Sequence, residues 1–327
     1  MKTNNKKILV TGGAGYVGSH VVKKLRDAGK SPVVFDNLST GRRENLLPDI
    51  PFILGDTLST KQLKEAMRDV DAIIHMAANK ASGESMTNPG KYATNNLIGT
   101  INLLNAAEES KIKYFVFSSS AAVYGEPKYL PLDEEHPTNP LNFYGYTKLE
   151  IENLLGWYSK LKDIRFASLR YFNAAGYDTE GEINGLEKEP NNLIPIVLET
   201  IIGKREEVVV FGSDYNTDDG SCVRDYIHVN DLAEAHLSAL CYLESQNKDL
   251  VVNLGTSKGL SVLEILRIAR EVSGTDFKYT LGPRRAGDPA VVLAKASLAQ
   301  KLLHWNPKQS DAVTLLETSL RAYRVSS

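Results

Sequence analysis

The chain is poor in cysteine, with only Cys222 and Cys241 among its 327 residues. Two cysteines that lie far apart exclude a disulfide-rich framework and are typical of a protein kept in a reducing compartment. The sequence also has no apolar run long enough to cross a bilayer as a helix, and its start lacks the apolar stretch of an export sequence. We therefore expect a cytoplasmic protein without a membrane partner.

An excess of charge of one sign is lacking as well, because 38 basic residues stand against 40 acidic ones. The basic residues form no stripe that alternates with aromatics, which excludes the electrostatic footprint of a nucleic-acid partner. Any recognition of phosphate must therefore be local. With a hydrophobic content of 42%, the chain can bury a sizeable core, and its length suits one large or two closely packed domains.

Short β-branched and aromatic segments alternate with segments of helical periodicity through the first half of the chain. Apolar residues recur at helical spacing from Val17 to Ala28, for example, and Gly29 follows as a helix stop. This alternation predicts an α/β fold with a doubly wound, Rossmann-type parallel sheet covered by helices on both faces. The expected strands are Ile8–Val10, Val33–Phe35, Phe52–Leu54, Ala72–His75, Tyr114–Ser118 and Arg165–Arg170, and the expected long helices are Tyr92–Glu109 and Tyr144–Lys160.

The pattern changes after Ala175. Residues 176–192 are rich in Gly, Glu and Asn, which is typical of a surface connection between two lobes. We therefore predict a first domain over residues 1–176 and a smaller mixed α/β domain over 177–327, with part of 222–255 returning to the first. The elements expected after the boundary are helices at Leu193–Ile202 and Asp231–Leu243, a strand at Val208–Phe211, and a helix opened by the capping box Ser261-x-x-Glu264.

A glycine-rich turn follows the first expected strand and opens the first expected helix. Gly12, Gly15 and Gly18 are three residues apart, so the turn can be tight and the backbone can approach a pyrophosphate at the helix N-terminus. Asp36 ends the next strand, where a carboxylate accepts hydrogen bonds from an adenosine ribose and repels a 2′-phosphate. The context predicts a dinucleotide site that prefers NAD to NADP. Arg42 and Arg43 are expected in a solvated loop.

The pair Tyr144-x-x-x-Lys148 stands at helical spacing, so both side chains point from one face of the helix. A free tyrosine has a pKa near ~10, and a neighbouring ammonium stabilises the phenolate that a base needs. The spacing also arises by chance in many helices, so the pair alone is weak evidence. It gains weight from the serine run Ser118–Ser120, which ends a strand at the edge where doubly wound sheets bind ligands. Ser118 and Ser119 are equally well explained as residues that end a strand.

With these features in place, the sequence resembles the extended short-chain dehydrogenase/reductase family, and within it the UDP-hexose 4-epimerases, over nearly its whole length. The matching stretches are TGGAGYVGSH at Thr11–His20, DNLS at Asp36–Ser39, HMAANKASGES at His75–Ser85, SSSAAVYG at Ser118–Gly125, YGYTK at Tyr144–Lys148, RYFN at Arg170–Asn173, VRDYIHV at Val223–Val229 and PRRAGD at Pro283–Asp288.

The resemblance implies roles for individual residues. Tyr144 is expected to act as general base and acid, Lys148 to hold the nicotinamide ribose and lower the tyrosine pKa, and Ser120 to hydrogen-bond the 4′-oxygen of the sugar. The implied NAD contacts are Gly12, Gly15, Tyr16, Val17, Asp36, Asn37, Asp56, Thr57, Met76, Ala77, Ala78, Lys80, Asn95, Tyr144, Lys148 and Phe172. The implied contacts to the UDP-sugar are Ser120, Tyr144, Asn173, Asn192, Leu193, Arg224, Arg285, Asp288 and Val292.

The implied reaction is the interconversion of UDP-glucose and UDP-galactose with no net redox change. The C4′ hydride passes to tightly held NAD, and the 4-keto sugar rotates and takes the hydride back on its other face. The two arginines suit a diphosphate, because guanidinium groups bind its oxygens in a bidentate way. A homodimer is expected, with Tyr92–Glu109 and the Tyr144 helix forming the bundle.

Several alternatives remain beside this interpretation. A 4,6-dehydratase would need an acidic pair where Ala121 and Ala122 stand. A UDP-glucuronate-type epimerase stays open, as does acceptance of UDP-N-acetylhexosamines, because Val292 matches a position where some relatives carry a bulky tyrosine. Val292 is equally well explained as a core residue. A non-catalytic NAD-binding regulator is disfavoured, because both Tyr144 and Lys148 are intact. No metal is expected, since His75 and His228 stand alone without ligand spacing.

Overall fold

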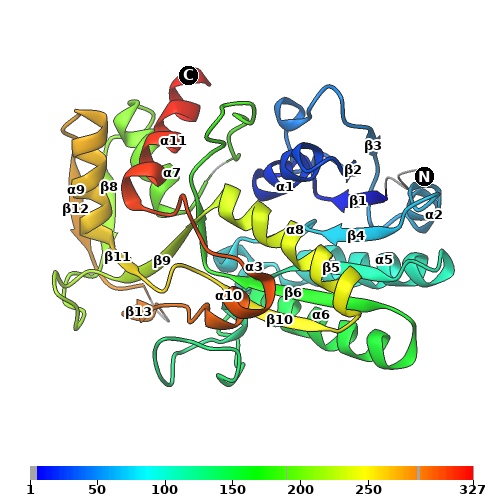
Figure 1. The fold of residues 1–327 in the computed structure, drawn as a ribbon. Helices are drawn as coiled ribbons and strands as arrows, with labels where there is room; N and C mark the ends of the chain where they lie inside the picture. Colours follow the sequence, from blue (N-terminus) through cyan, green and yellow to red (C-terminus); the bar gives the residue numbers. More distant parts are fainter. Residues whose placement is uncertain (1–5, 189, 286–287, 327) are drawn as a thin grey trace.

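The computed structural model describes residues 6–188, 190–285 and 288–326, so residues 286–287 of the PRRAGD stretch lie outside it. A parallel sheet of seven strands, counted over these described residues, forms the larger part of the molecule in the order β10-β6-β5-β4-β1-β2-β3 (Figure 1). Its strands are β1 (Lys7–Thr11), β2 (Ser31–Asp36), β3 (Phe52–Leu54), β4 (Ala72–His75), β5 (Tyr114–Ser120), β6 (Arg165–Tyr171) and β10 (Leu250–Leu254). The order reverses between β1 and β4, which is where doubly wound sheets bind ligands.

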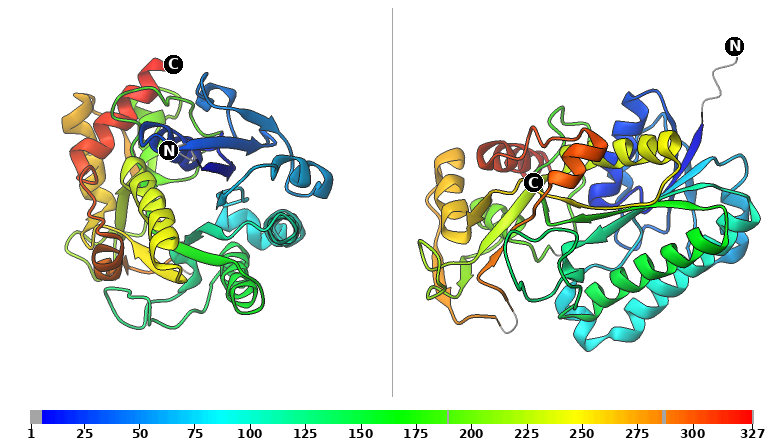
Figure 2. Two further views of the ribbon diagram at one scale, coloured as in Figure 1. Left: turned by 45° about the vertical axis from the view of Figure 1, so that its right-hand side comes forward. Right: turned by 60° about the horizontal axis from the view of Figure 1, so that its bottom comes forward.

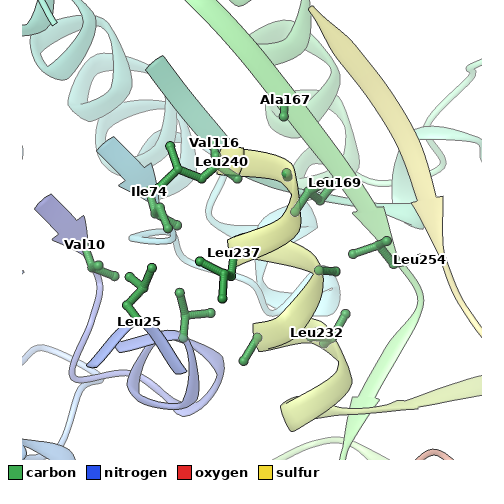
Figure 3. Close-up of a cluster of buried hydrophobic side chains, with 14 of the residues drawn as sticks. Val10, Leu25, Ile74, Val116, Ala167, Leu169, Leu232, Leu237, Leu240 and Leu254 are labelled. Atoms are coloured by element: carbon green, nitrogen blue, oxygen red, sulfur yellow. The ribbon is translucent and has the colours of Figure 1, made fainter. Parts of the chain in front are cut away.

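Helices cover both faces of this sheet, which is why its strands are nearly continuous apolar runs. One face carries α1 (Tyr16–Asp27), α8 (Val229–Gln246) and α10 (Ser297–Leu303), and the other carries α2 (Thr60–Ala66), α5 (Gly99–Glu109) and α6 (Phe143–Leu161). In the first core, Val10, Ile74 and Val116 pack under Leu237 and Leu240 of α8 (Figure 3). Short elements complete this part: η1 (Arg43–Asn45), α3 (Ser82–Thr87), α4 (Pro89–Tyr92), η2 (Ala93–Ile98) and η3 (Ala121–Val123).

A smaller lobe stands beside the carboxyl edge of the large sheet (Figure 2). Its strand β9 (Val223–His228) pairs with β7 (Asn173–Ala175), β11 (Gly259–Ser261) and β13 (Val291–Val292), while β8 (Val208–Phe211) pairs with β12 (Tyr279–Gly282). Helices α7 (Leu193–Ile201), α9 (Val262–Ser273) and α11 (Ala312–Val325) bury a core of their own. The chain leaves this lobe at the end of β9, and its continuation through α8 adds β10 to the large sheet.

The observed elements agree with most of the expected ones. All seven expected strands form, and the capping box Ser261-x-x-Glu264 opens α9 with both of its hydrogen bonds present. The single helix expected over Tyr92–Glu109 is wrong in detail. A π-helical segment, η2, interrupts it at Ala93–Ile98, and such segments are frequent at functional sites. Over the described ranges, no helix is both long and apolar enough to span a membrane.

The expectation of a surface connection over residues 176–192 is also wrong for its first part. Tyr177, Asp178 and Ile183 are at most 4% exposed. The reason is that side chains of the first lobe satisfy the polar groups of the segment. The ammonium of Lys23 lies 3.6 Å from the Asp178 carboxylate, and Asn45 Oδ1 accepts a hydrogen bond from the Gly185 amide at 2.9 Å. A polar, glycine-rich segment can therefore be buried.

Candidate active site

Most of the residues expected to contact the cofactor come together at one edge of the large sheet. All seven strands run parallel, so their carboxyl ends share this edge. The predicted residues at or directly after these strand ends are Gly12, Asp36, Asn37, Asp56, Thr57, Met76, Ala77, Ala78, Lys80, Ser120, Phe172 and Asn173. Gly15, Tyr16 and Val17 complete the turn into α1.

The glycine turn fits a pyrophosphate because side chains are excluded from it. Gly12 adopts a positive φ of 73°, and a Cβ atom there would lie 2.6 Å from the Ala77 amide nitrogen. A Cβ atom on Gly18 would lie 2.1 Å from the Gly12 carbonyl oxygen. Gly15 caps α1 without any side-chain hydrogen bond, so no side chain occupies the amides of the first turn. These amides and the positive end of the helix dipole can hold the phosphates of NAD.

The carboxylate of Asp36 is fixed at the end of β2. It accepts hydrogen bonds from the amides of Ala14 at 3.0 Å and Leu38 at 2.8 Å, and burial raises the pKa of this carboxyl. Each of its oxygens keeps a second lone pair, which suits the hydroxyls of an adenosine ribose. Next to it, Asn37 donates a hydrogen bond to Asp56 at 2.9 Å. The geometry at β2 and β3 therefore fits NAD.

Tyr16 and Lys80 lie where the segment after β7 crosses the glycine turn. The Tyr16 hydroxyl donates to the Gly176 carbonyl at 2.5 Å, and its ring lies 5.1 Å from the Tyr177 ring. The ammonium of Lys80 forms an ion pair with Glu187 and lies 5.8 Å from the centre of the Tyr16 ring. The cofactor side of the site thus receives one wall from the second lobe.

The π-helical segment η2 ties the loop after β4 to α6. Asn95 donates to the Asn96 carboxamide oxygen at 3.1 Å, and this oxygen also accepts from the Asn79 amide at 2.9 Å. The Asn96 amide group donates to the Asn79 carbonyl and to the Thr147 hydroxyl. Asn96 was not among the predicted site residues. Its burial demands such partners, but the sequence alone gave no signal for them.

The helix α6 carries Tyr144 and Lys148 to the end of β5. Asn142 begins the helix by accepting a hydrogen bond from the Gly145 amide at 2.8 Å. Lys148 is 3% exposed, donates to the Ser118 carbonyl at 2.6 Å, and lies 5.8 Å from the centre of the Tyr144 ring. Burial lowers the pKa of Lys148 to about 7, so its positive charge depends on its neighbours.

Tyr144 is hydrogen-bonded to Ser120. Burial and the nearby Tyr171 raise the pKa of Tyr144, whereas the hydrogen bond with Ser120 lowers it. The Ser120 hydroxyl also accepts a hydrogen bond from the Ala122 amide at 3.1 Å, which holds the start of η3. To release its proton near neutral pH, Tyr144 needs positive charge beside it. The Lys148 ammonium and the positive nicotinamide of bound NAD are the candidates for that charge.

The other two serines at the end of β5 have buried partners that sequence reasoning did not identify. The Ser118 hydroxyl shares a 2.5 Å hydrogen bond with the Tyr171 hydroxyl, and the Ser119 hydroxyl donates to Glu152 at 2.5 Å. Glu152 in turn pairs with Arg170 on β6. The expectation left open that these serines merely end a strand, but in the structure both hydroxyls join the packing between β5, β6 and α6.

The residues expected to bind the UDP-sugar lie mainly in the second lobe. Asn173 donates to the Asp225 carbonyl at 3.1 Å, and Asn192 and Leu193 stand at the start of α7. Arg224 on β9 forms an ion pair with Asp288, so a diphosphate there would compete with that carboxylate. The Arg285 carbonyl accepts a hydrogen bond from the Asp288 amide at 3.3 Å, and the Arg285 guanidinium lies 4.0 Å from the centre of the Phe211 ring.

Val292 lies beside Arg224 in the register of β13 and β9. Its side chain is half-buried and packs against the cluster of Val123, Tyr124 and Leu132, to which Phe172 also belongs. A packing role and a position near the cofactor side of the site are therefore compatible.

The two histidines considered for metal binding are buried and hydrogen-bonded. His75 bonds Thr11 at 2.7 Å and Thr100 at 2.8 Å, and His228 bonds the Asn230 amide at 3.0 Å and Thr318 at 3.2 Å. Both serve to join neighbouring elements. Within the described portion of the chain, no group of three or more His, Cys, Asp or Glu residues could hold a metal ion.

Known proteins match this chain over nearly its whole length. The model of the "NAD dependent epimerase/dehydratase family" matches residues 8–255. A UDP-glucose 4-epimerase of Lactobacillus helveticus is 43% identical over 320 residues, which covers 97% of each sequence. A UDP-glucose 4-epimerase of Brucella ovis, solved in complex with NAD, matches with a TM-score of 0.95 at 40% identity and covers 97% of this chain and 98% of that one. The UDP-Glc/GlcNAc 4-epimerase of Campylobacter jejuni matches with a TM-score of 0.87 at 38% identity, over 98% and 99% of the two chains.

Proposed function

The chain belongs to the NAD-dependent epimerase/dehydratase family, and we propose that it interconverts UDP-glucose and UDP-galactose by inverting the configuration at C4 of the hexose. It is an NAD-dependent isomerase, as the sequence resemblance predicted. The observation that carries the proposal is the meeting of Tyr144, Lys148 and Ser120 at the end of β5, beside a turn that fits a dinucleotide. This arrangement supports the roles of Tyr144 as proton acceptor and of Ser120 as the hydroxyl that orients the alcohol.

We assign the proton chemistry to this chain's own side chains. Ser120 orients the 4′-hydroxyl of the sugar, and Tyr144 takes its proton and later returns it. Lys148 stabilises the phenolate of Tyr144, because an adjacent positive charge favours the ionised form. Bound NAD supplies the acceptor and donor of the C4 hydride. The carbonyl that forms at C4 can be reduced on either face once the sugar turns, which inverts the centre.

The second lobe supports binding of the UDP part. Arg224 and Arg285 can neutralise a diphosphate. Asp288 follows shortly after Arg285 in the chain, and Asn192 and Leu193 begin α7 in the same lobe. A 4,6-dehydratase would need an acidic pair at the end of this strand. Ala121 and Ala122 stand at those positions, and neither can protonate a hydroxyl at C6. The residues thus suit epimerisation rather than dehydration.

We propose the division of the chain predicted from its sequence, with residues 1–176 binding NAD and 177–327 binding the UDP-sugar. The place of β10 in the large sheet supports the return of part of 222–255 to the first domain. We also propose a homodimer through Tyr92–Glu109, which includes η2 and α5, and through α6. The exposure of Ile98 at 48% and Trp157 at 58% supports it, because large apolar side chains on neighbouring helices favour association. A cytoplasmic location stays a prediction.

Incubation of the purified protein with a panel of UDP-sugars tests the proposal. Without added NAD, we expect inversion at C4 of UDP-glucose and UDP-galactose, and NMR of the anomeric protons monitors it. UDP-N-acetylhexosamines should also turn over, because Val292 stands where a bulky tyrosine would crowd the C2 substituent of the sugar. Inversion of UDP-glucuronate alone would replace the proposed substrate with a uronate. A protein that binds NAD and inverts none of these sugars would contradict the proposal and favour a non-catalytic role.

A further inference from the structure

The face of α6 that carries the catalytic pair continues one turn further to a buried acid. Tyr144, Lys148 and Glu152 follow each other at intervals of four residues, so they form one stripe on the helix. Each member meets one residue of the serine run. Tyr144 is hydrogen-bonded to Ser120, Lys148 donates to the Ser118 carbonyl, and Glu152 accepts from the Ser119 hydroxyl.

Glu152 is itself held by Arg170. The side chain of Arg170 reaches it from β6 with Nε at 3.0 Å and 3.2 Å from the two carboxylate oxygens and a terminal nitrogen at 2.6 Å. The two side chains are 6% and 8% exposed, so Arg170 rather than solvent holds the carboxylate in position. Such a pair contributes little net stability over an apolar pair of the same size, and it is best explained by what it positions.

The pair extends to the turn that follows the serine run. Arg170 donates to the Tyr124 hydroxyl at 3.1 Å, and Tyr124 donates to Asn253 on β10 at 2.6 Å. Tyr124 directly follows η3, whose first residue comes after Ser120. The network therefore holds both ends of the segment that carries Ser120, and it does so from β6 and β10.

We propose that Glu152, held by Arg170, is a positioning residue for the proposed epimerisation, which fixes the serine run against α6 and supplies the charge opposite Lys148. Other groups around Lys148 do not replace it. Tyr144 on the same helix and Tyr171 on β6 are neutral at pH 7, and burial lowers the pKa of His75 on β4 to about 3, so this histidine is neutral as well. The nearby charge of Glu152 raises the pKa of Lys148 against the effect of burial.

The variant Glu152→Gln in the holoenzyme tests this role. It keeps the shape and an acceptor for Ser119 but removes the charge. We expect the pKa of Lys148 to fall by about one unit, because an opposite charge at this range shifts a pKa by roughly that amount or more. Titration of 13Cε-labelled lysine by NMR measures this directly and needs no turnover, with Lys148→Arg providing the assignment. The alkaline limb of kcat should move to lower pH by the same amount, while KM changes less than about twofold.

Three further variants separate a positioning role of Glu152 from an effect of the substitution on folding. Glu152→Gln leaves Arg170 without its partner charge. The double variant with Arg170→Gln is therefore measured as well, and it should show the same lowered pKa of Lys148. Glu152→Asp retains the charge and should return the alkaline limb of kcat to its original pH. Glu150→Gln, at a half-buried position of α6 two residues before Glu152, is the matched control and should change neither value. An unchanged Lys148 titration in the foldable variants would overturn the inference. A shifted titration in a protein that inverts no sugar would instead contradict only the proposed function.

Discussion

Tyr144 is the residue on which the proposed chemistry depends most directly. Replacement by Phe keeps the ring and removes the hydroxyl that is hydrogen-bonded to Ser120. We expect kcat for UDP-galactose to fall by about 10²- to 10⁴-fold, which is the usual contribution of a general acid or base. The NAD content should stay unchanged, because the glycine turn and Asp36 are untouched. Steady-state kinetics and the absorbance of NAD released on denaturation measure the two quantities.

Tyr146 provides the matched control for this substitution. It lies two residues further along α6 and is 44% exposed, with its ring beside Phe143. Tyr146→Phe should therefore retain the activity of the unmodified enzyme. If Tyr144→Phe also retained it, another group would have to act as the base, and the assignment would be wrong.

Single residues were predictable where a local rule names them. Gly12 and Gly18 are required by the backbone of the turn, and Tyr144 and Lys148 share a helix face at a spacing visible in the sequence. Glu152 and Asn96 follow no such rule, because their roles depend on partners such as Arg170 and Asn79 in distant segments. Long-range pairing of buried polar groups is a property of the fold, and a single sequence does not display it.

At the scale of elements, the strands were easier to predict than the connections. A strand buried on both faces is a short apolar run bounded by turns, and β4 begins and ends at the predicted residues. The π-helical segment η2 has no periodicity of its own, so it was predicted as part of a regular helix. The segment after β7 looked exposed because it is polar, yet Lys23 and Asn45 supply the partners that allow its burial.

The start of α9 gives a test of an element whose cap was predicted correctly. Ser261 accepts a hydrogen bond from the Glu264 amide at 3.0 Å and also donates to Asp219. Ser261→Ala should lower the free energy of unfolding by about 1 kcal/mol, the typical cost of a lost N-cap. Urea denaturation followed by circular dichroism measures it. Ser261→Thr retains a capping oxygen and should recover most of the loss, so equal midpoints for the Ala and Thr variants would show that the cap contributes nothing.

The whole molecule joins two lobes through shared elements rather than through a single linker. The first core includes Leu232 and Leu254, which follow the second lobe's strand β9 in the chain. Trp305 comes later still and is buried in the same core, with its ring nitrogen donating to the Asp231 carbonyl at 2.8 Å. Such a crossing of the chain could be expected only in outline, because hydrophobic patterning tells which residues are buried and not which lobe buries them.

The buried histidines make the stability of the whole molecule depend on pH. Burial lowers the pKa of His20, His228 and His236 to about 4, and of His75 to about 3. An unfolded histidine has a pKa near ~6.5, so below that pH the unfolded chain binds protons that the folded protein does not. Stability is therefore fully present above pH ~6.5 and decreases as the pH falls toward the folded values, by up to about 1.4 kcal/mol per pH unit for each histidine.

Urea unfolding of the holoenzyme between roughly pH 7.5 and 5.5 measures this slope in a range above the ordinary pKa of carboxyl groups, which is near ~4. We expect the free energy of unfolding to stay nearly level above pH ~6.5 and to fall as the pH decreases below it. His236→Leu should flatten the slope by about one proton, because this side chain is fully buried on α8 and its Nε2 has no hydrogen-bond partner among the described residues. His304→Asn, at the exposed end of α10, should leave the slope as it is. His236 stays neutral only in the folded state, so its removal must change the number of protons that the chain takes up on unfolding. Equal slopes in the His236 variant and the unmodified enzyme would therefore mean that buried histidines do not govern the loss of stability in acid.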